Sequence, residues 1–175
     1  NGICDWSNFE QDLHWLNLKI QKKKSVTPPL VLSSLLDSAE IQKLGAELFV
    51  HDKFSLDNSL GPINKYAKNK KIKIGYFSPD FSDHPVAYLV TELLEKHDKS
   101  KFELFAFSLS PRIESETRLR IEKPFDEFFD VENLSDRDVA SLARQKKIDI
   151  AIDLAGYTTN SRPGIFSMNT APIQI

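Results

Sequence analysis

A polar loop that follows an apolar run holds the residues best suited to chemistry. Asp80, Asp83 and His84 come soon after the run Ile72–Phe77, and a helical pattern begins at Pro85. In an open α/β sheet, ligands are held where the carboxyl end of a strand meets the start of the next helix. An imidazole at such a position can exchange a proton with a substrate, so His84 is the first candidate catalytic residue.

Two interpretations of His84 stay open on the sequence. The positive end of a helix disfavours an imidazolium and favours a neutral ring that can accept a proton, whereas the carboxylates of Asp80 and Asp83 favour the charged ring. A histidine at a helix start can also cap backbone N–H groups or lie in solvent. Asp83 is expected to cap the helix that follows. With one histidine nearby and no Asp-x-Asp pair, the pattern does not favour a metal site.

A second polar segment, Asp153–Thr158, ends another apolar run. Gly156 permits a positive φ or a close backbone approach, while Tyr157 and Thr158 supply hydroxyl groups. An ordinary turn between a strand and a helix would have a similar composition. If both apolar runs are parallel strands, however, this segment and the loop of His84 lie at the same edge of a sheet, which makes a crevice more probable than either loop does separately.

The spacing of apolar residues predicts the elements that position these loops. The predicted strands cover 72–77, 103–109, 125–131 and 148–154, and the helices between them cover 85–97, 114–122 and 136–146. Ser135 is expected to cap the last of these helices. Alternation of strands and helices with short links predicts an α/β fold over residues 72–175, a Rossmann-like parallel sheet flanked by helices.

The first 71 residues are predicted as a helical linker region. Apolar residues recur at helical spacing around 9–20 and again around 41–48. Thr27–Pro29 is expected to form an extended connector, because proline disfavours helix interiors. The lysine-bearing stretch 55–71, with Lys65 and Lys68, reads as a solvated connector, since Tyr66 is its one aromatic residue for base stacking.

Composition restricts the class of protein. The chain has 175 residues, 41% of them apolar, and a net charge of −2, so it can bury a core and has no overall attraction for nucleic acid or anionic membranes. A single cysteine, Cys4, fits a reducing compartment, and without a secretion signal or a membrane span the expected location is cytoplasmic. The sequence lacks the dinucleotide fingerprint, the P-loop and G-x-S-x-G. Both ends are expected to be cut from a longer polypeptide.

Five short motifs occur in a fixed order between Ile72 and Ile175. They are Ile74-Gly75-Tyr76-x-Ser78-x-Asp80-Phe81-x-x-His84-Pro85, Lys101-Phe102-Glu103, Leu109-Ser110-Pro111, Asp153-Leu154-x-Gly156-Tyr157-Thr158 and Ala171-Pro172-Ile173-Gln174. Taken together they resemble the protein O-GlcNAc transferase family, especially SPINDLY-like bacterial members in which tetratricopeptide repeats precede the transferase. One departure is Ala155, where some relatives carry asparagine.

This resemblance implies an incomplete first lobe of a two-lobe glycosyltransferase that inverts the sugar's anomeric centre without metal or cofactor. The donor would be UDP-N-acetylglucosamine (UDP-GlcNAc) and the acceptor a Ser or Thr hydroxyl of a protein. Because most nucleotide contacts of the family come from the second lobe, the 175 residues are expected to be inactive in isolation. The remaining alternatives are a non-catalytic α/β interaction module and a transferase of this fold that uses another nucleotide sugar.

The resemblance also implies roles for individual residues. His84 would lie at the sugar-transfer site, as a general base or as a positioner of the sugar. The implied substrate-binding residues are Asp80, Pro85, Asp153, Gly156, Tyr157 and Thr158. The implied partners are an acceptor protein, a nucleotide sugar, a second catalytic lobe and N-terminal repeats, with neither nucleic acid nor a membrane among them.

Overall fold

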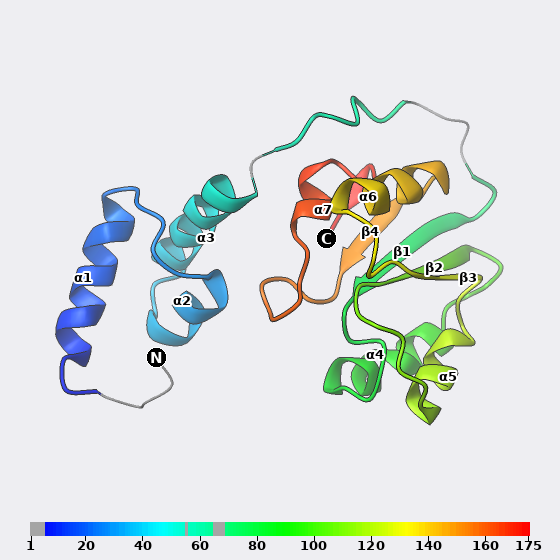
Figure 1. The fold of residues 1–175 in the computed structure, drawn as a ribbon, viewed down its shortest axis with the longest axis horizontal. Coiled ribbons are helices and arrows are strands. Elements are labelled where there is room, and N and C mark those ends of the chain that lie inside the picture. The colour runs from blue at the N-terminus through cyan, green and yellow to red at the C-terminus, as the bar shows by residue number, and fades with distance from the viewer. Residues whose placement is uncertain (1–5, 55, 65–68) are drawn as a thin grey trace. The chain divides into compact units, whose positions relative to one another are not determined.

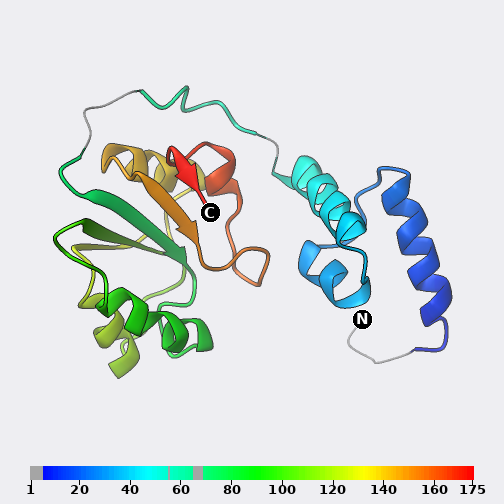
Figure 2. The same cartoon turned by 180° about the vertical axis from the view of Figure 1, so that it is seen from behind.

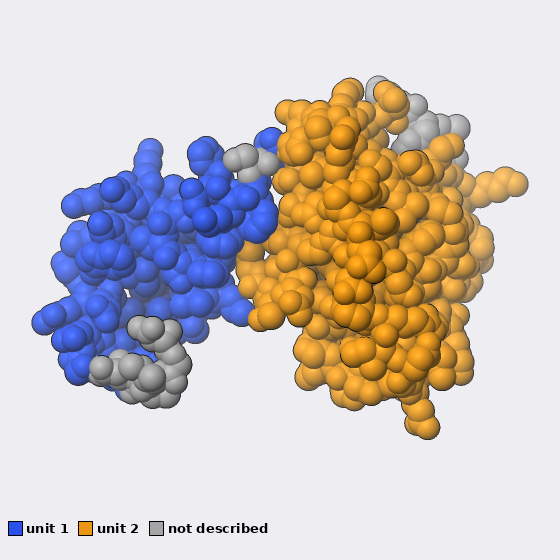
Figure 3. Space-filling view, in the orientation of Figure 1, with its two compact units in different colours: residues 1–56 blue, residues 57–175 orange. Residues whose placement is uncertain are grey.

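A computed structural model describes residues 6–54, 56–64 and 69–175. The chain divides into two compact units, 1–56 and 57–175, which Figure 3 colours separately. Cys4 and the linker residues Lys65, Tyr66 and Lys68 lie outside the described part, so the predictions made for them stay predictions.

The first unit contains three helices, α1 (Phe9–Gln21), α2 (Pro29–Leu35) and α3 (Ala39–Lys53). Their apolar faces meet in a small core that includes the buried side chains of Ile20 and Leu32. The expected extended connector at Thr27–Pro29 is wrong at its end, because Pro29 begins α2. Proline is well suited to the first turn of a helix, since its missing N–H would have no partner there and its φ is already helical.

The second unit is built around a five-stranded sheet (Figure 1). Its strands are β1 (Ile72–Ser78), β2 (Phe102–Ser108), β3 (Glu127–Asp130), β4 (Ile150–Asp153) and β5 (Ile173–Gln174), and its helices are α4 (Pro85–Glu95), α5 (Glu116–Glu122), α6 (Asp136–Gln145) and α7 (Gly164–Ser167). Neighbouring strands pair in parallel in the order β3-β2-β1-β4-β5. The predicted parallel α/β fold is confirmed, and the predicted strand and helix ends differ from the observed ones by at most two residues.

Alternate residues of the strands enter two separate cores. Ile74 and Tyr76 of β1 pack on the side of α4 and α5, whereas Phe77 packs on the side of α6 and α7. Figures 1 and 2 show the two helix pairs on opposite faces of the sheet. A β-carbon at Gly75 would lie 3.1 Å from both Ile148 Cγ2 and Phe107 Cε2, so this strand position tolerates no larger residue without repacking.

The strand order reverses between β1 and β4. From β1 the chain moves outward through β2 to β3, then crosses to the other side of β1 to form β4 and β5. In doubly wound sheets the crossover helices leave such a switch point uncovered at the carboxyl ends of the strands, and ligands bind there. The order of the strands therefore selects the end of the β1–β4 pair as the place to look for a site.

The second compact unit also includes residues that precede β1. The backbone N–H of Asp57 donates to Ser167 O at 3.0 Å, and the Arg144 guanidinium donates to Leu60 O and Gly61 O at 3.0 and 2.9 Å. The boundary predicted at 71/72 is based on the change from helical to strand periodicity. The compact units divide at 56/57 instead, because these contacts attach residues 57–64 to the sheet-containing unit.

We expect Arg144→Met to loosen this attachment. Arg144 also donates to Met168 O and Asn169 O, so the substitution removes charge-assisted hydrogen bonds to four backbone carbonyls. Since a net contribution of about 1.5–3 kcal/mol is typical of a hydrogen bond to a charged group, the free energy of unfolding should fall by about 2 kcal/mol or more. Thermal unfolding measures the loss, and limited proteolysis should show faster cleavage within 57–64. Arg137→Met, at an exposed position of the same helix, is the control for the loss of charge alone, because it removes an attraction for Asp57 but none of these hydrogen bonds.

Candidate active site

The loop after β1 is fixed at its start and in its middle. Ser78, fully buried at the end of β1, accepts a hydrogen bond at Oγ from the backbone N–H of Asp80 at 3.0 Å. Phe81 turns inward and is 1% exposed, with its ring against Phe125 and Phe128. Because Phe81 is held in the core, the polar residues on either side of it have a defined position at the edge of the sheet.

His84 is the N-cap of α4. Its Nδ1 accepts a hydrogen bond from the backbone N–H of Val86 at 3.2 Å, and Nδ1 also lies 3.6 Å from Oδ2 of Asp80. The following residue, Pro85, restricts His84 to an extended backbone (φ −146°, ψ 147°), which is the conformation an N-cap requires. The side chain is 44% exposed, so the ring both caps the helix and reaches solvent.

The predicted cap at Asp83 is therefore wrong. Asp83 accepts a long hydrogen bond from the hydroxyl of Tyr88 at 3.5 Å instead. The physical reason is the place of Pro85, which takes the first helical position and leaves the preceding residue, His84, as the cap.

The second predicted segment forms a tight turn after β4. Asp153 Oδ1 accepts a hydrogen bond from Ala155 N at 2.9 Å, and Thr158 Oγ1 donates to Ala155 O at 2.9 Å. Gly156 adopts φ +57°, a conformation that favours glycine. Tyr157 is partly exposed beside this turn, so the segment presents a phenol and a carboxylate on a backbone that its own hydrogen bonds hold in place.

Burial shifts the titration of both acidic groups in this turn. It raises the pKa of Asp153 above its usual range, although hydrogen bonds from Ala155 and Gly156 oppose the change. Burial also raises the pKa of the Tyr157 phenol, and the negative charge of Asp153 adds to the effect. A phenol with an ordinary pKa near 10 is already protonated at neutral pH, and the upward shift leaves Tyr157 a hydrogen-bond donor there.

The register of β1 and β4 places the two predicted segments at one edge. Phe77 is the partner of Asp153, and Leu154 N donates to Phe77 O at 3.0 Å. The loop that carries Asp80, His84 and Pro85 therefore leaves the sheet beside the turn that carries Asp153 to Thr158. The predicted common edge is confirmed, while the catalytic and binding roles of these residues stay predictions.

Sequence reasoning missed a charged cluster beside the same loop. Arg118 of α5 is 1% exposed and contacts the ends of β2 and β3 at Ser108 and Asp130. An arginine four residues before Glu122 resembles an ordinary surface pair on a helix, so no signal in the sequence pointed to its burial. In the part of the chain that the structure describes, no three side chains of His, Cys, Asp or Glu gather as metal ligands would.

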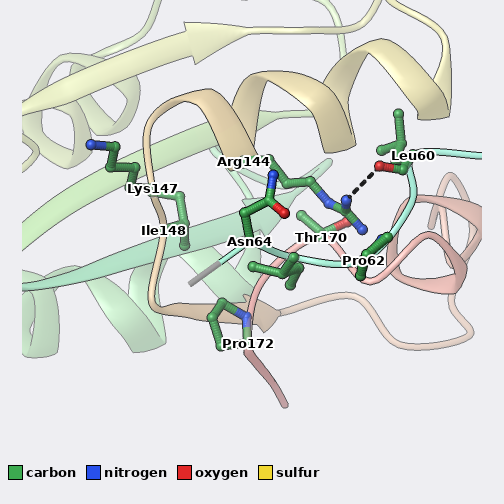
Figure 4. Close-up of a pocket in the computed structure, with 9 residues that line it drawn as sticks. Leu60, Pro62, Asn64, Arg144, Lys147, Ile148, Thr170 and Pro172 are labelled. Atoms are coloured by element: carbon green, nitrogen blue, oxygen red, sulfur yellow. Dashed lines mark hydrogen bonds between the residues drawn. The ribbon is translucent and has the colours of Figure 1, made fainter. Parts of the chain in front are cut away.

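A cavity of about 330 Å³ lies near the amino ends of the strands, away from the loops of the predicted site (Figure 4). It is lined by Leu60, Pro62, Ile63, Asn64, Arg144, Lys147, Ile148, Thr170 and Pro172. Ile148 and Pro172 precede β4 and β5, so the cavity borders the amino ends of these strands, and its Arg144 is already bonded to backbone carbonyls. None of the predicted site residues contributes to its lining, and we assign it no role in the site.

Asp153→Asn should raise the melting temperature at pH 7. A raised pKa in the folded state means that the stability present below the ordinary carboxyl pKa of 3.8 is lost as the pH rises through the folded value. An amide is neutral throughout and can still accept the hydrogen bond of Ala155, so it avoids that loss. Thermal unfolding between pH 4 and pH 7 should show an advantage for the variant that shrinks as the pH falls.

Asp98→Asn is a control for which we expect the opposite change in melting temperature. Hydrogen bonds from Ser100 lower the pKa of Asp98, so its ionised form stabilises the fold and the amide should lower the melting temperature at pH 7. Equal effects of the two substitutions at pH 7 would contradict the assignment of Asp153 as a destabilised carboxylate.

Comparison of the sequence with known proteins relates the chain to a family of glycosyltransferases. Residues 3–175 match the model of glycosyl transferase family 41. A probable UDP-N-acetylglucosamine–peptide N-acetylglucosaminyltransferase SEC of Arabidopsis thaliana is 37% identical over 65% of this chain and 12% of its own length. The UDP-N-acetylglucosamine–peptide N-acetylglucosaminyltransferase of Caenorhabditis elegans is 28% identical over 99% of this chain and 16% of its own length.

A solved structure shares the fold. The K341M mutant of the Thermobaculum terrenum O-GlcNAc transferase superimposes with a TM-score of 0.71 and 26% sequence identity, over 83% of this chain and 28% of the solved one. The chain therefore spans less than a third of the solved relative and less than a fifth of the two curated ones. Since the family model covers nearly all of its residues, the chain belongs to glycosyl transferase family 41.

Proposed function

We propose that the protein containing this chain transfers N-acetylglucosamine from UDP-GlcNAc to Ser or Thr hydroxyls of proteins. Membership of family 41 and the names of the relatives support the reaction class. The observation that carries the proposal at the level of residues is the meeting of the His84 loop and the Asp153–Thr158 turn at the switch point between β1 and β4. Inversion at the anomeric centre, and independence from metal and cofactor, belong to the same proposal.

The reaction makes two demands on the site. The acceptor hydroxyl must lose its proton as its oxygen attacks the anomeric carbon, and the leaving UDP must be stabilised. Tyr157 and Thr158 offer hydroxyl groups for the sugar, and Asp80 and Asp153 offer carboxylate oxygens, with Pro85 fixing the backbone beside His84. We assign these residues to binding and orienting the sugar. The second lobe of the protein would supply most contacts to the nucleotide, so the isolated 175 residues should not turn over UDP-GlcNAc.

The cap bond of His84 restricts what its ring can do. A backbone N–H that donates to Nδ1 needs the lone pair of that nitrogen, so the neutral ring carries its proton on Nε2. In this arrangement Nε2 can donate a hydrogen bond to a substrate oxygen. It has no lone pair with which to take the proton of the acceptor hydroxyl. We therefore favour His84 as a positioner of the sugar, with a phosphate oxygen of the donor as the alternative base.

The non-catalytic alternative rests on the same bond. An α/β interaction module would also use His84 as a helix cap, as the structure has it. A fully active His84→Ala full-length protein would support that alternative. The third candidate, a transferase for another nucleotide sugar, differs only in the donor.

A donor panel tests the proposed reaction. The full-length protein is incubated with candidate acceptor proteins and, in turn, UDP-GlcNAc and other nucleotide sugars, and the acceptors are analysed by mass spectrometry. Addition of N-acetylhexosamine to Ser or Thr with UDP-GlcNAc supports the proposal, and a chelator should leave the rate unchanged. Transfer of another sugar in preference would assign a different donor to the site.

Substitution of His84 should separate its two roles. We expect His84→Ala to lower kcat/KM by about 100-fold, the loss that misplacing a substrate by about 1 Å can cause, and loss of the cap to cost about 1 kcal/mol of stability. Asparagine is a good N-cap with a side-chain donor but cannot act as a base, so His84→Asn should recover the stability and part of the activity. A general base predicts equally inactive Ala and Asn variants.

The pH dependence of the rate gives a second readout. If His84 positions the sugar without titrating, the acidic limb of the pH–rate profile persists in His84→Ala at a lower rate. Disappearance of that limb in the alanine variant would identify His84 as the base.

The remaining expectations are also part of the proposal. None of the helices in the described part of the chain has the length and apolarity that crossing a membrane requires. We propose with it a cytoplasmic location, acceptor proteins as partners and N-terminal tetratricopeptide repeats in the full-length protein.

A further inference from the structure

A buried arginine cluster lies beside the loop of His84 and has no part in the proposed chemistry. Arg118, 1% exposed, donates from Nε to Glu122 Oε1 at 2.6 Å and from Nη2 to Asp130 Oδ1 at 2.6 Å. Its Nη1 donates to Ser108 Oγ at 3.1 Å. A guanidinium that is buried and held on three sides has a fixed orientation, because leaving any of these partners would strand a charge.

The same guanidinium also contacts the loop of His84, at the buried residue Phe81. Nη1 of Arg118 donates a second, longer hydrogen bond to the carbonyl oxygen of Phe81 at 3.5 Å. The guanidinium carbon also lies 4.1 Å from the centre of the Phe128 ring, which packs edge-to-face against Phe81. Phe81 is therefore held both through its carbonyl oxygen and through its ring.

Phe81 is the fixed point between Asp80 and His84. Asp80 is tied on one side to Ser78, and His84 on the other side starts α4. Between them, Phe81 supplies the inward anchor, so a shift of its carbonyl changes where the imidazole ring lies relative to the turn after β4. Displacements of about 1 Å at a reacting centre can cost about 100-fold in rate.

A second arginine, Arg112, belongs to the same cluster and also pairs with Glu114. Arg112 donates from Nη1 to Glu122 Oε1 at 2.5 Å, and the same atom lies 3.6 Å from Asp130 Oδ2. Arg112 therefore shares both carboxylates with Arg118 from the more exposed side. The carboxylates orient Arg118 and remain paired with Arg112 if Arg118 is replaced.

We infer that Arg118 is a positioning residue that sets the place of His84 at the switch point by holding the backbone of Phe81. The kinetic part of this inference rests on the proposed function, whereas the part about loop order does not.

Arg118→Lys is the first test variant, made in the full-length protein. Lysine keeps the charge but cannot reproduce the planar fork that reaches Glu122, Asp130 and Phe81 together. Arg118→Met/Asp130→Asn is the second variant, in which both charges are removed so that no buried ion is left without its partner. Arg120→Lys is the matched control: this exposed arginine of the same helix pairs with Glu95 and makes no contact with the loop.

Two measurements are made on all variants. Hydrogen–deuterium exchange with mass spectrometry follows the peptide spanning 79–88, which contains the Val86 amide that His84 caps, and reference peptides from β4 and α6. Initial rates with UDP-GlcNAc and an acceptor protein give kcat and KM. We expect faster exchange confined to 79–88 in both test variants, and kcat lower by about 10–100-fold with a smaller change in KM for the donor.

The inference is overturned if both folded test variants keep wild-type exchange in 79–88, or if exchange rises equally in the reference peptides. The second pattern would identify Arg118 as a general stabiliser of the lobe. Faster exchange confined to 79–88 supports the inference even if the wild-type protein shows no transfer of the sugar, and in that case the proposed function fails by itself.

Discussion

The parallel pairing of β1 with β4 is the interaction on which the rest of the site depends. The two strands are far apart in the chain, yet the register brings Phe77 opposite Asp153. Because the strand order reverses at this pair, the crossover helices leave on opposite faces, and the carboxyl ends of the two strands are open. The histidine loop and the tyrosine–threonine turn become neighbours only through this pairing.

Close packing keeps the pair in register. Phe77 is fully buried and stacks on Phe107 of β2 with ring centres 4.3 Å apart. Gly75, in the same strand, leaves the space that Ile148 and Phe107 occupy. A slip of one residue would move every side chain of β1 to the other face of the sheet, so the two cores specify the register strongly. The two loops that carry the site residues therefore start from strand ends whose register is specified by the core.

Local structure then limits the chemistry of the histidine. Pro85 makes His84 the N-cap of α4, and the cap bond uses the lone pair of Nδ1. The contact that fixes the imidazole in place thus also fixes which of its nitrogens carries the proton. Under the proposed function, a ring held in this way would orient the sugar, and the proton of the acceptor hydroxyl would go to another oxygen. Tyr157, in the turn after β4, brings a protonated phenol to the same edge of the sheet.

The sequence by itself determined the class of fold, the approximate bounds of strands and helices, the family and the two loops of interest. Periodicity of apolar residues and short ordered motifs are local properties of a chain, and they survive without knowledge of the fold. Local preference alone nevertheless points to Asp83 as the cap, because carboxylates are common caps, whereas Pro85 takes the first helical position and makes His84 the cap. Only the tertiary structure decided that β4 pairs with β1, that residues 57–64 join the sheet-containing unit and that Arg118 is buried under Phe81. These facts depend on contacts between residues distant in sequence. The sequence around a charged helical residue does not indicate which distant backbone group that residue will contact.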